Sequence, residues 1–336
     1  MRRVGNLFDA IVEPANLRLA FWRAARGKRH RPEVMRFAVT LDERLADMRI
    51  RLLSGTFPVG RFHQFEIHDP KRRIITAPVF PERVLHHAIV SVCEPHFERW
   101  LIADTFACRP GKGREAAVLR SAGFSRRFPW LVHLDVRQCF DSVPHGLLGE
   151  RLARHFKDRR LLDLFAAIIA GFRGEVGHGL PIGSLTSQHF ANLYLGSLDR
   201  FAKEGLRAAG YVRYMDDLVL WGEDQEEVIG RAERCRTFLQ AELGLDFKPA
   251  RPRPAAHGLD FLGCRIYPTH TTLSRRSRGR YRRRVRLLTR AFRLGLLDGR
   301  SLQVRLEAAA AFARAARAKS WQFRAAVLES LPVGDP

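Results

Sequence analysis

The segment that decides how this chain is interpreted is Tyr211-Val212-Arg213-Tyr214-Met215-Asp216-Asp217-Leu218-Val219-Leu220. Apolar residues on both sides of two adjacent aspartates predict a β-hairpin with the acidic pair at its tip. Because Asp is favoured in turns, an isolated Asp-Asp pair is most simply a solvated turn. A further carboxylate argues against that interpretation, since the buried-type strand Trp130-Leu131-Val132-His133-Leu134 ends at Asp135.

If these strands belong to one sheet, Asp135, Asp216 and Asp217 come together. Three carboxylates repel one another unless divalent ions lie between them, and hard oxygen ligands of this kind favour Mg²⁺. Two such ions about 3.5–4 Å apart stabilise the attacking and the leaving oxygen of an in-line phosphoryl transfer. The carboxylates therefore predict metal-dependent phosphoryl transfer. They do not separate a polymerase from a nuclease, because both classes use the same metals.

The order of the predicted elements indicates an α+β fold. The strand that ends at Asp135 is followed by helices, the hairpin, a helix at about 226–243 and strands near Phe247 and 261–266. This order predicts a small, mostly antiparallel sheet that is backed by helices on one face. Asp141 or Ser142 is expected near the N-cap of the helix after the strand, with Pro144 in its first turn.

The first 130 residues are expected to be mainly helical with short strands. A helix from about Glu82 to Trp100 should follow Pro81, with a kink or an interruption at Pro95. Before this helix, residues 61–77 predict a second hairpin, which turns at Asp69-Pro70.

The charge balance predicts a polyanionic partner. The chain has 58 Lys and Arg against 35 Asp and Glu, which gives a net charge of +23. Such an excess destabilises the folded state by self-repulsion unless a polyanion binds it. An anionic membrane is the rival interpretation, but the basic residues lie along the whole chain rather than on one amphipathic helix. Nucleic acid is therefore the expected partner.

The basic residues are densest near the C-terminus. No Asp or Glu occurs from Phe261 to Leu297, a stretch that contains eleven arginines. A run of this kind is often a disordered tail. Here an apolar side predicts instead a folded helix that grips a phosphate backbone; its members are Val285, Leu287, Leu288 and Phe292.

The number and spacing of the cysteines indicate the cellular compartment in which the protein works. The five cysteines form no CxxC pair, which argues against a zinc site and against a secreted disulfide framework. Reduced thiols in a cytoplasmic protein are expected. Neither an apolar leader nor a membrane-spanning stretch is expected.

Three motifs together resemble those of reverse transcriptases. Tyr214-Met215-Asp216-Asp217 resembles their metal-binding hairpin. Residues 134–142 resemble their first palm motif, a strand-end aspartate with an aromatic residue five positions later. Residues 179–188 resemble the loop and helix start that lie beneath the nucleotide, and the order and spacing of all three motifs agree.

The sequence of the loop at residues 179–188 indicates which group of reverse transcriptases the chain resembles. Group II intron and most bacterial reverse transcriptases have Gln and Ser-Pro where this chain has Ile182 and Ser187-Gln188. The variant resembles the reverse transcriptases of diversity-generating retroelements, which are bacterial or phage-encoded. The similarity covers nearly the whole chain, and the length suits an enzyme with no appended maturase or endonuclease domain.

The resemblance implies a role for each metal-site residue. Asp135 and Asp216 would bind two Mg²⁺ ions, which Mn²⁺ can replace, and Asp217 would assist. The carbonyl of Val136 would join the metal shell. Phe140 would be a steric gate, whose ring occupies the space of a ribose 2′-hydroxyl and so selects deoxynucleotides; a core phenylalanine is the alternative.

The resemblance also implies nucleotide contacts. Arg73 would lie on the incoming nucleotide through its planar guanidinium. Lys71 would reach the same triphosphate, unless it is a solvated turn lysine. Ile182 and Gln188 would belong to the nucleotide site. An apolar Ile182 in place of an amide would loosen geometric checking, in agreement with the error-prone copying of template adenines in that family.

Template and primer contacts would come from basic residues in two regions. Arg109 and Lys112, in a glycine-rich turn, would touch template phosphate, although an exposed loop is an equally open interpretation. Arg282, Arg283 and Arg284 would bind the template–primer duplex from the C-terminal helices.

The expected architecture is a right-hand polymerase. Residues 1–130 would form the fingers, 131–149 the palm with the first metal ligand, and 150–178 helices of the fingers and palm. Residues 179–267 would complete the palm, and 268–336 would form a basic, helical thumb. The palm would hold an antiparallel sheet backed by helices.

The expected function is RNA-directed synthesis of cDNA from dNTPs on a retroelement template RNA. A small, basic, helical-bundle oligomer would be the accessory protein, and no membrane would be involved. A retron-type or phage-defence reverse transcriptase is the alternative within the same chemistry. A non-catalytic RNA-binding scaffold with a polymerase fold is the alternative from another class. A metal-dependent nuclease would have no use for the steric gate or the nucleotide loop.

Overall fold

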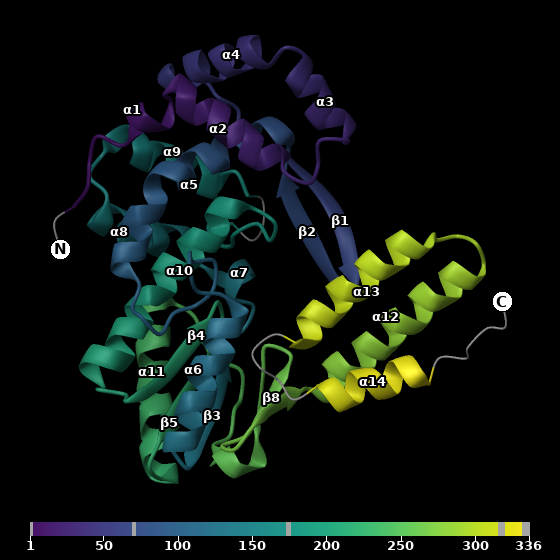
Figure 1. Ribbon diagram of the computed structural model, residues 1–336. Helices are drawn as coiled ribbons and strands as arrows, with labels where there is room; N and C mark the ends of the chain where they lie inside the picture. The colour runs from purple at the N-terminus through teal and green to yellow at the C-terminus, as the bar shows by residue number, and fades with distance from the viewer. Residues whose placement is uncertain (1–2, 69–71, 173–175, 315–319, 331–336) are drawn as a thin grey trace. The chain divides into compact units, whose positions relative to one another are not determined.

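Figure 1 shows the computed structural model of the chain, which describes residues 3–68, 72–172, 176–314 and 320–330. The chain divides into two compact units. The first comprises Met1–Ala103, Val136–Phe201 and Cys235–Lys248, and the second comprises Asp104–Asp135, Ala202–Arg234 and Pro249–Pro336. The boundaries of fingers, palm and thumb given above stay a prediction.

Helices make up most of the first unit. They are α1 (Phe8–Ile11), α2 (Pro14–Ala25), α3 (Pro32–Val39), α4 (Leu41–Leu53), α5 (Phe80–Trp100), α7 (Cys139–Ser142), α8 (His145–His155), α9 (Arg159–Ala170) and α10 (Leu185–Arg200). The next helix, α11 (Gln225–Leu243), runs from the second unit into the first. Among the described residues, no helix combines the length and apolar character needed to span a bilayer.

The N-terminal hairpin of the first unit consists of β1 (Phe62–His68) and β2 (Arg72–Pro78). The two strands are antiparallel and pair Phe62 with Pro78 at one end and His68 with Arg72 at the other. The expected hairpin at residues 61–77 is thereby confirmed. Its expected turn at Asp69-Pro70 lies outside the described residues.

Helix α5 is continuous, so the interruption expected at Pro95 is wrong. The helix starts at Phe80, with Pro81 in its first turn, and continues through Pro95 to Trp100. Pro95 is exposed. The opposite face of the same turns buries Cys93 and Phe97. We attribute the continuity to this burial, which offsets the hydrogen bond that proline removes from the helix.

The helix expected after Asp135 also begins differently. Asp141 and Ser142 end the short helix α7, and Pro144 is the N-cap of α8 rather than a residue of its first turn. Gln138 has a left-handed backbone (φ 43°), which turns the chain into α7 early. Val143 is extended and separates the two helices, since a residue before proline avoids the helical region.

The second unit contains two antiparallel sheets. In the first, the strand order is β4 (Gly210–Tyr214), β5 (Asp217–Gly222), β3 (Trp130–Asp135) and β6 (Arg253–Pro254). In the second, β7 (Leu259–Phe261), β8 (Cys264–Ile266) and β9 (Thr271–Leu273) follow one another. The expected strand near Phe247 is instead an isolated bridge to Val136.

One face of the four-stranded sheet packs on α6 (Arg114–Arg127), as the sequence predicts for a helix-backed sheet. The core between them contains Val118 and Phe124 of α6, Leu131 of β3 and Trp221 of β5. The unit also contains the π-helical segment η1 (Phe201–Gly205), which starts at the last residue of the first unit, and the 3₁₀ segment η2 (Ala255–His257).

The basic C-terminal stretch is folded, as expected. It forms α12 (Arg275–Arg293), α13 (Gly299–Arg314) and α14 (Trp321–Glu329), with α13 and α14 both packed on α12 (Figure 1). Val285 of α12 is buried against this small core, and Leu288 is buried as well. Leu287 is exposed and projects away from the stripe that the helical period assigns to Val285 and Leu288, so its expected place on the apolar side is wrong. Phe292 continues that stripe, but it lies at the C-terminal end of α12 and stays partly exposed.

Candidate active site

Asp135 and Asp217 lie opposite each other on neighbouring strands. The antiparallel register of β3 and β5 pairs Leu131 with Trp221, His133 with Val219, and Asp135 with Asp217. Because side chains alternate along a strand, these six residues share one face of the sheet. The row begins in the buried core under α6 and ends at the two half-buried carboxylates. The sheet thus presents both aspartates at the open end of an apolar row.

Asp216 lies in the tight turn between β4 and β5. Tyr214 and Asp217 pair across this turn, and Met215 within it has a left-handed backbone (φ 56°). The fully buried Arg213 donates from its guanidinium Nη1 to the carbonyl of Met215 at 2.9 Å. A charge-assisted hydrogen bond therefore supports the turn that carries Asp216. Sequence reasoning missed Arg213, although an arginine inside an apolar strand was a signal.

His133 is a second residue that sequence reasoning missed. Its Nε2 lies 3.3 Å from Oδ1 of Asp217, and the ring packs edge-on against Phe261. The available signal was spacing, because a residue two positions before Asp135 on a strand shares its face. The contact gives the Asp217 carboxylate a fixed neighbour on the sheet.

The donor set suits a hard divalent cation. Mg²⁺ prefers carboxylate oxygens and often takes only one or two from the protein, since waters and substrate phosphates complete its octahedron. The opposed pair Asp135 and Asp217, with Asp216 next in the chain, offers this kind of partial shell. Within the described part of the chain, no three His, Cys, Asp or Glu side chains are placed as a ready-made metal site. The convergence of all three carboxylates stays a prediction.

Val136 and Phe140 follow β3 and belong to the first unit. Val136 is bridged to Phe247, and the amide of Arg137 donates to the carbonyl of Asp246 at 2.8 Å. Phe140 is half-buried on α7. Burial raises the pKa of the adjacent Asp141 carboxyl. The metal contact of the Val136 carbonyl and the gating role of Phe140 stay predictions.

The loop at residues 179–184 is held by backbone hydrogen bonds within the first unit. The amide of Leu180 donates to the carbonyl of Phe140 at 2.6 Å, and the amide of Thr76 donates to the carbonyl of Ile182 at 2.8 Å. Gly183 has φ 118°, and a Cβ placed there would lie 2.8 Å from Cγ2 of Ile75. Only glycine therefore fits the point where the loop meets β2.

The predicted nucleotide contacts occupy three elements of the same unit. Arg73 is exposed on β2, Ile182 is half-buried in the loop, and Gln188 is half-buried in the first turn of α10. The Thr76–Ile182 bond brings β2 and the loop together. Lys71 lies outside the described residues.

A family model described as reverse transcriptase (RNA-dependent DNA polymerase) matches residues 68–266. The match takes in more than half of the chain, including both aspartate motifs and the loop. The chain belongs to the reverse transcriptase family.

The similar proteins include products of introns. The Group II intron-encoded protein LtrA of Lactococcus lactis is 26% identical over 172 residues, which are 48% of this chain and 28% of that protein. The "Uncharacterized 91 kDa protein in cob intron" of Schizosaccharomyces pombe is 30% identical over 126 residues, which are 36% of this chain and 15% of that protein. The region shared with these two intron-encoded relatives is thus less than a third of their own length.

Two further similar proteins align with a larger share of this chain. Protein YkfC of Escherichia coli is 25% identical over 268 residues, which are 65% of this chain and 70% of that protein. The structure of telomerase from Candida albicans with a fragment of telomeric RNA aligns with 82% of this chain and 55% of that chain, at 11% identity and a TM-score of 0.48.

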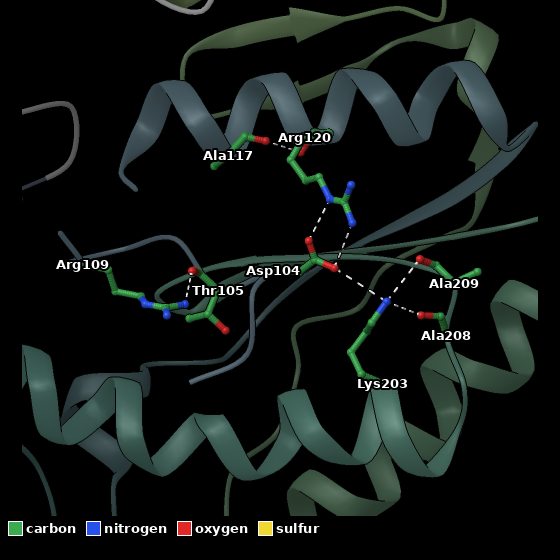
Figure 2. Close-up of polar contacts among 9 residues, drawn as sticks. Asp104, Thr105, Arg109, Ala117, Arg120, Lys203, Ala208 and Ala209 are labelled. Carbon is green, nitrogen blue, oxygen red and sulfur yellow. Dashed lines mark hydrogen bonds and ion pairs between the residues drawn. The ribbon is translucent and has the colours of Figure 1, made fainter. Parts of the chain in front are cut away.

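The glycine-rich turn of this reverse transcriptase is anchored to its own unit. Figure 2 shows Arg109 donating from Nη1 to the carbonyl of Thr105, at 2.7 Å. Lys112 places its ammonium 5.2 Å from the ring centre of Phe106. Both side chains are half-buried, and their predicted contact with template phosphate stays a prediction.

A buried carboxylate fixes the start of this turn. Asp104 accepts from Nε of Arg120 at 2.8 Å and lies 3.6 Å from Nζ of Lys203, as Figure 2 shows. The backbone carbonyl of Asp104 accepts from the amide of Arg213 at 3.0 Å, so the segment lies against β4. The glycine-rich turn is therefore tied to the strand that leads into the Asp216 turn.

The predicted thumb arginines lie on α12. Arg282, Arg283 and Arg284 are all exposed, and the guanidinium of Arg282 lies 5.2 Å from the ring centre of Phe323 on α14. The helix carries ten arginines and no acidic residue. Outside the buried stripe that faces α13 and α14, arginines dominate the surface of α12, and Leu287 is an exposed apolar exception.

Proposed function

We propose that this chain is an RNA-directed DNA polymerase that makes cDNA by two-metal phosphoryl transfer. The observation that carries the proposal is the register of β3 and β5, which sets Asp135 opposite Asp217 with Asp216 in the adjoining turn. The family match covers this region, and its name describes the proposed activity. The chain covers only part of its intron relatives, so their other activities are not transferred.

In this proposal Asp135, Asp216 and Asp217 would hold two Mg²⁺ ions, for which Mn²⁺ could substitute. When bound, the metal ions would activate the primer 3′-hydroxyl and neutralise the triphosphate and the departing pyrophosphate. Arg73 binds the triphosphate, and the ring of Phe140 excludes a ribose 2′-hydroxyl. Arg213 and His133 support the aspartates, through the Met215 carbonyl and the Asp217 carboxylate respectively.

A basic groove at the base of α12 supports nucleic-acid binding. The groove has a volume of about 630 Å³ and is lined by Arg265, Tyr267, Arg275, Arg278 and Arg282, among others. Asp260, also in its lining, pairs with Arg265. Among the described residues, no carboxylate forms an ion pair with Arg275, Arg278 or Arg282. Uncompensated guanidinium groups in a concave surface suit phosphodiesters, which accept paired hydrogen bonds from the arginine fork.

We further propose that the enzyme serves a diversity-generating retroelement and copies template adenines with errors. The support is the loop sequence, in which Ile182 offers no side-chain hydrogen bond and its carbonyl is already used by the amide of Thr76. A site with fewer polar contacts checks base-pair geometry less strictly. A small basic accessory oligomer and a structured template RNA belong to the same proposal.

Primer extension on a defined RNA template with Mg²⁺ and dNTPs tests both proposals when the product is sequenced. We expect extension by the wild-type protein, none by Asp216→Asn, and normal extension by Asp224→Asn, which changes an exposed carboxylate of the same unit. Errors concentrated opposite template adenine, and fewer of them with Ile182→Gln, support the retroelement assignment. Faithful copying would favour a retron-type or phage-defence enzyme. Failure to extend, with RNA and accessory protein supplied, would favour the scaffold.

A further inference from the structure

A chain of buried polar side chains crosses the first unit beneath the nucleotide loop. Glu82 is fully buried and its carboxylate accepts from the amides of Gly60 at 3.1 Å and Arg61 at 3.0 Å. One helical turn later, His86 is only 1% exposed, and its Nε2 lies 3.6 Å from Oε1 of Glu82. Its Nδ1 lies 3.0 Å from the hydroxyl of Ser184.

This chain joins the two segments that carry the proposed nucleotide contacts. Gly60 and Arg61 lead directly into β1, and Ser184 is the N-cap of α10 at the end of the loop. The amide of Thr76 on β2 donates to the carbonyl of Ile182 at 2.8 Å. The hairpin that carries Arg73 and the loop that carries Ile182 are therefore connected in two ways. One is the backbone hydrogen bond from Thr76, and the other is the row of buried polar side chains from Glu82 to Ser184.

Burial makes the chain sensitive to the loss of any member. A polar group away from water is costly unless it is hydrogen-bonded, and removing one partner leaves the other unsatisfied. Within the described residues, Nε2 of His86 has no hydrogen-bond partner, because Glu82 lies just beyond bonding distance. The link between the loop and α5 is therefore on the Nδ1 side of the ring, where the hydroxyl of Ser184 is the nearer partner at 3.0 Å and that of Thr186 lies at 3.5 Å.

We propose that Glu82, His86 and Ser184 are positioning residues that set the loop against the hairpin and so determine the affinity for the incoming dNTP. This inference rests on the proposed polymerase function. None of the three needs to touch the nucleotide, since the effect passes through Ile182 and Arg73. The burial of His86 and its contacts to Glu82 and Ser184 give it this role.

Steady-state incorporation of a single dNTP, with the primer–template affinity measured separately, tests the proposal. We expect His86→Ala and Ser184→Ala to raise KM for dNTP by about tenfold, the effect of losing one buried hydrogen bond, with little change in kcat. His86→Asn places an amide near the Nδ1 position and should keep KM close to wild type. His86→Gln reaches instead toward Glu82 and should behave like His86→Ala.

The matched control is Ser121→Ala, which removes a buried serine hydroxyl that donates within α6 to the carbonyl of Ala117 at 2.8 Å. It should leave KM unchanged. A purely structural role of His86 would lower stability in all three variants without the split between His86→Asn and His86→Gln, and would overturn the proposal.

Hydrogen exchange of the Thr76 amide separates failure of this inference from failure of the proposed function. The amide should exchange faster in His86→Ala and Ser184→Ala than in wild type or Ser121→Ala, whether or not the protein incorporates nucleotides. Unchanged exchange at Thr76 would show that the buried chain does not hold the loop.

Discussion

Single residues beside the aspartates fix the position of the Asp217 carboxylate and of the turn that carries Asp216. His133 on β3 contacts a carboxylate oxygen of Asp217, and Arg213, within the hairpin itself, donates to the backbone carbonyl of Met215 in its turn. A rigid arrangement of this kind lowers the cost of bringing like charges to a cation. Neither residue is needed for the metal shell itself, which makes their contribution measurable.

The first prediction concerns His133. His133→Ala should slow dNTP incorporation by about tenfold, because a hydrogen bond to a charged group is lost from Asp217. Stability should change little, since the side chain is half-exposed. The measurement is a single-turnover rate, with His63→Ala on the exposed side of β1 as the control. Equal rates for wild type and His133→Ala would contradict the role given to this contact.

The loop at residues 179–184 approaches the hairpin closely at Gly183. Gly183→Ala adds a methyl 2.8 Å from Ile75 at a backbone angle that side chains avoid. We expect a loss of stability of roughly 1–3 kcal/mol together with a raised KM for dNTP. Gly123→Ala is the control, because its Cβ meets nothing within 4 Å in the middle of α6.

Thermal unfolding and dNTP titration of both glycine variants provide the measurement. Gly123→Ala should be neutral or slightly stabilising, since alanine is the better helix former. If Gly183→Ala is as stable and as active as Gly123→Ala, the loop is not held against β2 as described.

Local sequence was sufficient for elements whose pattern is strong. The strand ending at Asp135 and the hairpin around Asp216 follow from alternation, and the helix predicted at about 82–100 follows from the proline before it. Long-range packing decided the rest. Pro95 stays inside α5 because apolar residues on the opposite face are buried, and Leu287 is exposed because α13 and α14 pack on the stripe that carries Val285. The contacts of His86, His133 and Arg213 depend on register and on tertiary partners, which a single sequence does not display.

The third prediction concerns α12 as a phosphate-binding element. Replacing Arg275, Arg278 and Arg282 together by Gln should weaken RNA binding. It should also make the negative slope of log K against log salt concentration shallower by about 2–3, since each phosphate contact contributes about 0.7–0.9. The control replaces Arg36, Arg49 and Arg159, which are exposed on other helices and remove the same charge. Equal slopes for the two triple variants would mean that the groove is not a specific phosphate site.

At the scale of the whole molecule, buried histidines couple stability to pH. His189 packs on Phe97 with ring centres 5.5 Å apart, and burial lowers its pKa to about 4. The unfolded chain would bind a proton at about pH 6.5. Because the unfolded state then holds a proton that the folded state does not, stability falls as the pH drops from about 6.5 toward 4.

Urea unfolding at pH 6.5 and pH 5 measures this effect. His189 alone should remove about 2 kcal/mol of stability over that interval, and His189→Gln should flatten the dependence by that amount. Burial also lowers the pKa of His87 to about 4, so the free energy of unfolding of the variant should still depend on pH to some extent. An unchanged slope in His189→Gln would mean that His189 titrates in the folded protein as it does in the unfolded chain.

The central claim is that the opposed aspartates of β3 and β5 carry RNA-templated DNA synthesis. Single-turnover addition of one dNTP to a primer on RNA, compared between wild type, Asp135→Asn, Asp217→Asn and the control Asp224→Asn, tests it most directly. We expect a loss of about a thousandfold or more for Asp135→Asn, a smaller loss for Asp217→Asn and wild-type rates for the control. Incorporation by Asp135→Asn at the wild-type rate, or none by the folded wild-type protein, would contradict the claim.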